Sequence, residues 1–312
     1  MHYKFKVRFL VFLLIISASP LFYSSLTTFH SLWIQEPRLC ACHTCLNEGT
    51  SCFSELINDS PPPFMSRQNK TSPDGLRWWQ SIQGGKPNST YFNKTVDSLF
   101  EIFPPVPSMV ASSPSRCITC AVVGNSGNLN RSRYGPLIDF HDIVIRINRG
   151  RTKGYETDVG TKTTHHVMYP ESANKLPNTT YLLFFPFKIS DFLWLHKKFN
   201  PEKNKATGLD NFANKDLVMI LNPAFMRYVH EDWLGRRGYY PSTGFLTVIL
   251  SLQMCDEVSV FGFGADSDGN WSHYFEKLTD KRLKTGAHPG TDEYNIIMKL
   301  HKKKKITFFR GW

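Results

Sequence analysis

The clearest pattern in the chain is a series of short apolar runs after residue 116, separated by helix-like stretches of mixed polarity. The runs span residues 120–125, 142–148, 165–170, 180–187, 216–222, 245–254, 257–264 and 305–311. Short apolar runs in this setting are typical of buried parallel strands with helices on both faces of the sheet. The pattern therefore predicts an α/β fold, a single domain with a mostly parallel, twisted sheet flanked by helices. In such sheets ligands bind at the carboxyl ends of the strands.

The N-terminal third has a different pattern. Three basic residues in 1–8 precede an uncharged apolar stretch, 9–26, and residues 27–115 are rich in Ser, Thr, Asn and Pro. We expect a cytoplasmic tail at 1–8, a signal anchor at 9–27, a stem at 28–75 and a lumenal domain at 76–312. A cleaved signal peptide is the alternative, although no A-x-A-like cleavage site follows the apolar stretch. Within 76–83, LRWWQSIQ predicts a helix that packs onto the domain through Trp78 and Trp79.

Glycosylation sequons agree with a lumenal location, since N-x-[ST] is modified only in the secretory pathway. Chance accounts for some of them, but they are crowded before residue 100. They stand at Asn58, Asn69, Asn88, Asn93, Asn130, Asn178 and Asn270.

The seven cysteines allow two interpretations. Two CxxC pairs, Cys42 with Cys45 and Cys117 with Cys120, have the spacing of zinc ligands. In an oxidising lumen the same residues form disulfides with one cysteine left over. The apolar N-terminal stretch and the sequons favour disulfides.

The formal net charge of +11 adds only a little to the prediction, and it concerns the partners of the protein. Nucleic acid is absent from a secretory lumen, so we expect no nucleic-acid partner. The basic balance indicates instead an anionic small substrate or an acidic glycan surface.

The first apolar run ends in a glycine turn, Gly124-Asn125-Ser126-Gly127-Asn128. This turn lacks the third glycine of a dinucleotide loop, the GK[ST] of a P-loop and the GxSxG of a hydrolase elbow. A tight strand-to-helix turn remains, and its backbone N–H groups can bind an anion.

Four longer segments decide what this turn resembles. Residues 120–172, CAVVGNSGNLNRSRYGPLIDFHDIVIRINRGRTKGYETDVGTKTTHHVMYPES, closely resemble the large sialyl motif of animal sialyltransferases. GYYPSTGFLTVILSLQMCDEVSVFGFGADSDGNW resembles the small motif, HYFE at 273–276 the third motif, and HPGTDE at 288–293 the very small motif. The order is that of the family, and HDIVIRIN, DVGTKTTHH, YPSTG and RWWxxxQ resemble most its beta-galactoside alpha-2,3-sialyltransferase type 1 and 2 branch.

The resemblance implies a Rossmann-like, GT-A-variant glycosyltransferase fold whose glycine turn binds CMP-sialic acid. It implies that His288 is the general base toward a galactose hydroxyl and that His273 donates a hydrogen bond to the departing phosphate. Histidine suits both tasks because its ordinary pKa lies close to neutrality. The paired His165 and His166 are interpreted as structural residues.

The family pattern also implies a set of substrate contacts. Asn amides can bind both donors and acceptors of a nucleotide, and glycines allow close approach of the backbone. Gln83 matches a contact to the acceptor sugar. The nucleotide contacts carried over are Asn125, Asn148, Tyr240, Gly244 and Gly264.

Asp266-Ser267-Asp268 has the D-x-D form with which many glycosyltransferases bind a divalent metal. The leaving group implied here is a nucleoside monophosphate, whose smaller charge His273 and backbone donors can meet. We expect no metal and no cofactor, and we interpret the segment as a polar loop.

The resemblance implies three disulfides, Cys120–Cys255, Cys42–Cys117 and Cys40–Cys45, with Cys52 unassigned. It implies transfer of sialic acid from CMP-N-acetylneuraminate to the 3-hydroxyl of galactose, with Gal-beta-1,3-GalNAc of O-glycans as the expected acceptor. The expected partners are CMP-sialic acid, galactose-terminated glycoproteins or glycolipids and the Golgi membrane; a homodimer and a secreted proteolytic form stay open. The alternatives are a sialyltransferase of other acceptor choice and a catalytically silent glycan-binding or CMP-binding homologue.

Overall fold

The structure is a computed structural model that describes residues 40–42, 46, 51–82, 84, 88–105, 113–200, 212–277 and 287–312. The chain divides into two compact units, Met1–Leu39 and Cys40–Trp312, and the second contains every described residue. Among the described residues no helix is long and apolar enough to cross a membrane. The predicted anchor lies outside them, so the boundaries of tail, anchor, stem and domain stay predictions.

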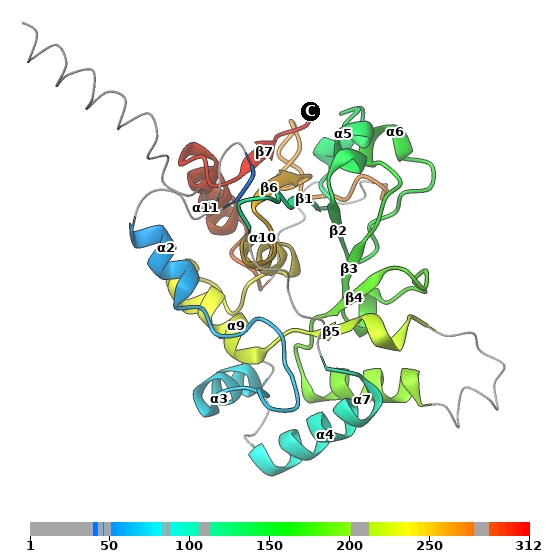
Figure 1. Ribbon diagram of the computed structural model, residues 1–312. Helices are drawn as coiled ribbons and strands as arrows, with labels where there is room; N and C mark the ends of the chain where they lie inside the picture. The colour runs from blue at the N-terminus through cyan, green and yellow to red at the C-terminus, as the bar shows by residue number, and fades with distance from the viewer. Residues whose placement is uncertain are drawn as a thin grey trace, which may run out of the picture. The chain divides into compact units, whose positions relative to one another are not determined.

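A parallel sheet forms the centre of the second unit (Figure 1). In the described part of the chain its strand order is β5-β4-β3-β2-β1-β6-β7, and each neighbouring pair is parallel. The order reverses between β1 and β6, which is where such sheets bind ligands. The predicted fold class is thus confirmed. The strands are β1 (Thr119–Val123), β2 (Ile143–Ile147), β3 (His165–Met168), β4 (Tyr181–Phe184), β5 (Val218–Ile220), β6 (Glu257–Phe261) and β7 (Thr307–Phe309).

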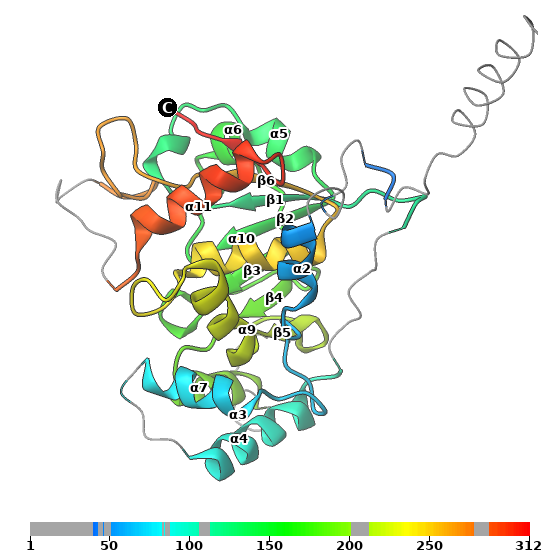
Figure 2. The same ribbon diagram turned by 90° about the vertical axis from the view of Figure 1, so that its left-hand side faces the viewer.

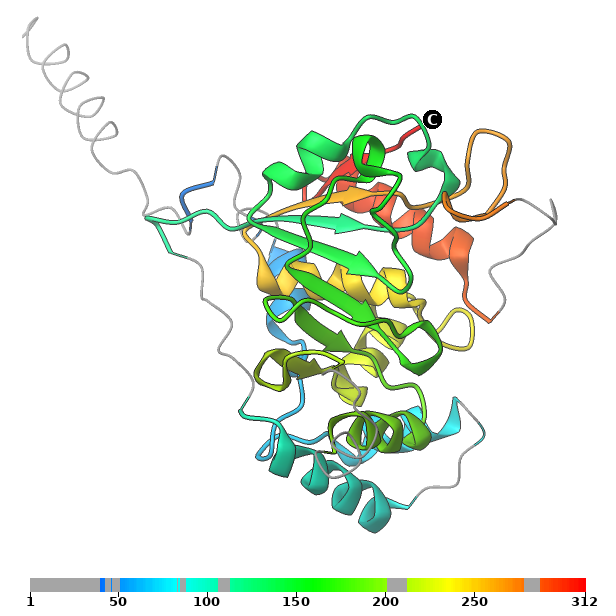
Figure 3. The ribbon, with the colours of Figure 1, turned by 90° about the vertical axis from the view of Figure 1, so that its right-hand side faces the viewer.

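Helices cover both faces of the sheet (Figures 2 and 3). Helices α10 (Thr243–Met254), α9 (Pro223–Tyr228), α11 (Gly290–Lys302) and α2 (Ser51–Asn58) lie on one face, and α5 (Gly135–Phe140) and α6 (Glu156–Val159) on the other. Side chains alternate accordingly along β1. Cys120 and Val122 belong to the larger core, while Ala121 and Val123 belong to the smaller core beneath α5 and α6.

One predicted strand is wrong. Residues 245–254 belong to helix α10, which is buried along most of its length. A helix with apolar residues all round reads as a continuous apolar run, because burial on every side removes the 3.6-residue periodicity. The run therefore did not distinguish a central helix from a central strand.

Helix α3 (Pro73–Ser81) confirms the helix expected around Trp78 and Trp79. It begins at Ser72, whose side chain accepts a hydrogen bond from the Gly75 N–H, and Pro73 occupies its first turn. Trp79 is buried, and its Nε1 donates to the carbonyl of Pro186 at 2.8 Å. Together with α4 (Ser89–Ile102) and α7 (Ile189–Phe199), α3 closes the end of the fold beyond β5 (Figure 1).

The disulfides connect distant parts of the unit. Cys42 is bonded to Cys117 and Cys120 to Cys255, as expected. Cys40 is disulfide-bonded too, but its expected partner Cys45 lies outside the described residues.

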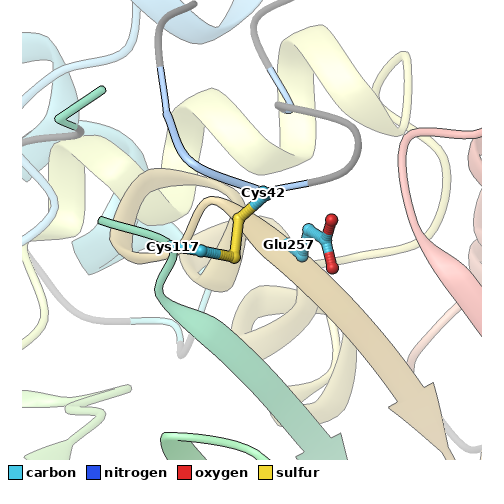
Figure 4. Close-up of side chains that lie close together, drawn as sticks. All are labelled: Cys42, Cys117 and Glu257. Carbon is cyan, nitrogen blue, oxygen red and sulfur yellow. A yellow bond between two sulfur atoms is a disulfide. The ribbon is translucent and has the colours of Figure 1, made fainter. Parts of the chain in front are cut away.

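The side chains of Cys42, Cys117 and Glu257 offer ligand atoms within 4.8 Å of one another (Figure 4). The two sulfurs are bonded to each other and are not thiolates, which are the form that binds zinc. This group is therefore a disulfide beside a carboxylate, and the zinc interpretation of its cysteines is wrong.

Candidate active site

A cavity of about 430 Å³ lies beyond the carboxyl ends of β1, β2 and β6. Gln83, the predicted acceptor contact, lies outside the described residues. Tyr240 does not line the cavity but contacts a residue that does, since its ring meets His288 edge-to-face at 4.9 Å. The other predicted site residues all line it: Asn125, Asn148, Gly244, Gly264, His273 and His288.

The turn after β1 is pressed against the turn after β6. The N–H of Gly124 donates to the Phe261 carbonyl at 2.8 Å, and that of Ser126 donates to the Gly262 carbonyl at 3.0 Å. A Cβ atom on Gly124 would lie 2.3 Å from the Gly262 carbonyl oxygen. Glycine is therefore required by the close approach of the two turns at the centre of the sheet.

Two asparagines face the cavity from these loops. The Nδ2 of Asn125 donates to the Ile147 carbonyl at 2.9 Å, and its buried Oδ1 has no hydrogen-bond partner among the described residues. Asn148 follows β2 with a φ of 55°, and its Oδ1 accepts from the Ser172 hydroxyl at 3.0 Å. A buried unpaired oxygen is costly unless a ligand supplies a donor. This favours Asn125 as a contact to a bound molecule.

The paired histidines of β3 are both buried. The Nε2 of His166 donates to the Asn148 carbonyl at 2.6 Å, while His165 stacks on Tyr181 with ring centroids 4.6 Å apart. Burial lowers the pKa of each to about 4. Neither lines the cavity, so both have the surroundings of structural residues.

His288 is oriented by a backbone carbonyl. Its Nδ1 donates to the Tyr240 carbonyl at 3.2 Å, which leaves Nε2 as the basic nitrogen of the neutral ring. Burial lowers the pKa of His288, and the hydrogen bond to Tyr240 opposes this shift. A neutral, oriented imidazole in a cavity has the form of a general base.

His273 is held differently, in a half-exposed position. Its Nδ1 donates to the Glu276 carboxylate at 2.8 Å, and its ring stacks on Phe275 with centroids 5.3 Å apart. The segment around it is bonded to the glycine turn, because Gly127 N–H donates to the Ser272 carbonyl and Tyr274 N–H to the Asn125 carbonyl. A carboxylate on one nitrogen orients the other for donation to an anion.

Comparison with known proteins decides the family. Residues 64–305 match glycosyltransferase family 29 (sialyltransferase). The chain belongs to this family.

Similar proteins include the CMP-N-acetylneuraminate-beta-galactosamide-alpha-2,3-sialyltransferase 1 of Gallus gallus, 43% identical over 88% of this chain and 83% of that protein. The sialyltransferase 2 of Mus musculus is 40% identical over 88% of this chain and 81% of the relative. Two crystal structures of a mammalian sialyltransferase cover 88% of this chain and are fully covered by it. One has a TM-score of 0.77 and 40% identity; the other, in complex with Gal-beta-1-3GalNAc-ortho-nitrophenol, has 0.74 and 39%.

Several residues that line the cavity of this sialyltransferase were not predicted from the sequence, and Glu293 is the one among them with a strongly shifted pKa. Glu293 is 7% exposed, and its carboxylate accepts from the Ser242 N–H at 2.7 Å and the Ser242 hydroxyl at 2.6 Å. Ser242 also caps helix α10 by accepting from the Phe245 N–H. Burial raises the pKa of Glu293 to about 7. Glu293 ends the HPGTDE segment, so the signal was present, but only its histidine was given a role.

In the D-x-D segment of the sialyltransferase, the carboxylate of Asp266 accepts hydrogen bonds from residues of its own loop. One carboxylate oxygen of Asp266 accepts from the N–H groups of Asp268 and Asn270, and both oxygens accept from the Asn270 side chain. These donors hold the Asp266 carboxylate within its own loop. The geometry is that of a capped polar loop, and Asn270 is buried within it.

Proposed function

We propose that the chain transfers sialic acid from CMP-N-acetylneuraminate to the 3-hydroxyl of terminal galactose, with Gal-beta-1,3-GalNAc of O-glycans as the acceptor. The observation that carries the proposal is that His288 and His273 line one cavity with Asn125 and Asn148. The alpha-2,3-sialyltransferase names of its relatives and the disaccharide in a solved neighbour support the choice of acceptor.

The reaction is written as a single displacement. His288 Nε2 removes the proton of the galactose 3-hydroxyl, whose oxygen forms a bond to the anomeric carbon of sialic acid. The bond from that carbon to the phosphate oxygen breaks, and its electron pair leaves with CMP. The Nε2–H of His273 stabilises the charge that develops on the phosphate. Attack opposite the leaving group inverts the anomeric centre.

The proposal includes a location. A single-pass type II Golgi enzyme with a lumenal catalytic domain fits the disulfides of Cys42 and Cys120, because such bonds persist in oxidising compartments. It also fits the uncharged stretch at 9–26 that follows a basic tail.

The test compares the full chain with its His288→Ala variant, each given CMP-sialic acid and Gal-beta-1,3-GalNAc in the presence of EDTA. We expect transfer by the wild type and a fall in kcat of about 10²–10⁴-fold in the variant, with CMP binding kept. Linkage analysis of the product should give the 3-isomer.

Three results would contradict parts of the proposal. Preference for galactose on a glycolipid or N-glycan would overturn the acceptor. Loss of transfer in EDTA with recovery on adding a divalent ion would overturn metal independence. CMP binding without transfer to any galactoside would favour the silent homologue.

A further inference from the structure

A π-helical turn, Val229–Trp233, follows helix α9 and contains a buried histidine, His230. The turn closes with the Leu234 N–H donating to the Val229 carbonyl at 3.2 Å. Turns of this kind are rare and are concentrated at functional sites. His230 does not line the cavity, so its position needs another explanation.

The contacts of His230 are specific on one side of the ring and incomplete on the other. Its Nε2 donates to the Gly238 carbonyl at 3.1 Å, and its ring lies against Trp78 of helix α3 with centroids 5.4 Å apart. Its buried Nδ1 has no hydrogen-bond partner within the described ranges. An unpaired buried nitrogen is destabilising. The bond from Nε2 to the Gly238 carbonyl is thus the contact of this ring that an apolar ring could not make.

The segment bonded by His230 is packed against the segment that contains the proposed base. Gly238 has a φ of 69°, and a Cβ atom there would lie 2.5 Å from Cδ of Pro289, the residue after His288. Two further bonds join the same segments. Tyr239 N–H donates to the Ala287 carbonyl at 3.2 Å, and the Tyr240 carbonyl accepts from His288 itself.

Helix α3 supports the same region from a second direction. Trp79 bonds the carbonyl of Pro186, and the next residue, Phe187, packs on Tyr240 with ring centroids 5.6 Å apart. Trp78 therefore contacts the π-helical turn through His230, which bonds Gly238. Trp79 bonds the loop whose next residue packs on Tyr240, the residue that orients His288.

We infer that His230 is a positioning residue for the base: by fixing the Gly238 carbonyl it sets the 238–240 segment against Pro289 and so fixes the place of the His288 ring. The inference rests on the proposed function, in which His288 is the base. Displacement of a catalytic group by about 1 Å can cost on the order of 100-fold in rate.

Two variants of the full chain separate positioning from folding. His230→Phe keeps an aromatic ring against Trp78, removes the unpaired Nδ1 and lacks the donor. We expect kcat to fall about 10-fold or more, with the melting temperature not lowered. The dissociation constant for CMP should change less than kcat, because Tyr240 is the one expected nucleotide contact on the 238–240 segment and the others lie on separate parts of the cavity. His230→Gln restores an amide donor near the Nε2 position and should recover most of kcat.

The matched control is His301→Phe. His301 also bonds backbone groups, with Nδ1 accepting from the Phe308 N–H at 3.2 Å, but it lies at the end of α11 away from the cavity. We expect its kcat to equal that of the wild type.

Three outcomes would overturn the inference: kcat of His230→Phe within about twofold of wild type, a parallel loss of CMP affinity and melting temperature, or no recovery in His230→Gln. A His288→Ala variant measured alongside distinguishes failure of the proposed base from failure of the inference about His230. If its kcat stays within about tenfold of wild type, the proposed base is wrong and the inference falls with it. If it is inactive while His230→Phe is fully active, only the inference fails.

Discussion

At the scale of single residues, the site depends on imidazole and carboxyl groups whose protonation is set by burial. The Tyr240 carbonyl fixes which nitrogen of His288 carries hydrogen, and burial lowers the pKa of the ring. The neutral, basic form therefore persists below the pH at which an exposed histidine would be protonated.

This shift predicts the acid limb of the pH–rate profile. We expect kcat/KM for transfer to rise with pH through a pKa below the ordinary 6.5 and to be level near neutrality. The measurement is a pH series at subsaturating donor. A limb centred at or above 6.5 that persists in His273→Gln would contradict the assignment.

Glu293 should make folding stability depend on pH in the opposite direction from most carboxylates. Its pKa is raised from 4.5 to about 7, so the folded state binds a proton that the unfolded state has already released between these values. The free energy of unfolding therefore falls as pH rises from 4.5 to 7. The fall due to Glu293 is about 3 kcal/mol at most. Glu293→Gln can keep the bond to the Ser242 N–H and should remove this slope. Urea unfolding at pH 5.5 and 7.5 measures the change in the free energy of unfolding between these pH values. An equal change in the wild type and in Glu293→Gln would contradict the prediction.

At the scale of elements, the Cys120–Cys255 bond joins the start of β1 to the end of α10. It closes a loop of 135 residues, which chain-entropy reasoning values at about 5 kcal/mol.

We expect Cys120→Ser with Cys255→Ser to lower the yield of folded chain severely, because the bond joins two elements whose other ends both reach the cavity. Yield and thermal unfolding measure this effect. The Cys42→Ser/Cys117→Ser pair is the matched comparison, since it joins segments remote from the cavity; equal or greater loss there would argue against a special role for Cys120–Cys255.

The elements also show how far the sequence could predict the structure. Strands such as the one within 142–148 could be predicted because a short apolar run between helical stretches is typically a buried strand. Helix α10 was mistaken for a strand because a helix buried on all sides has no polar face to reveal its period. Glu293 was missed as a partner of Ser242 for a different reason. The two residues lie 51 positions apart, and no local pattern predicts which buried carboxylate will cap which helix.

At the scale of the whole molecule, charge should affect the encounter with the donor. The chain has a formal net charge of +11, and the donor carries a phosphate and a carboxylate. Attraction of this kind is screened over about 8 Å at physiological salt.

We therefore expect kcat/KM for CMP-sialic acid to fall several-fold between low and physiological salt, while kcat/KM for a neutral galactoside changes less. Initial rates over a sodium chloride series measure both. Equal salt dependence of the two substrates would contradict the prediction.

The strand order has a consequence for how the chain is made. β1 lies inside the sheet, but its neighbour β6 follows it by more than a hundred residues, and His288 and helix α11 come later still. A ribosome that has delivered β1 to β5 has delivered one wall of the cavity and an open edge along β1. The cavity is incomplete until the last quarter of the chain has emerged, so under the proposed function we expect activity only when translation is nearly finished.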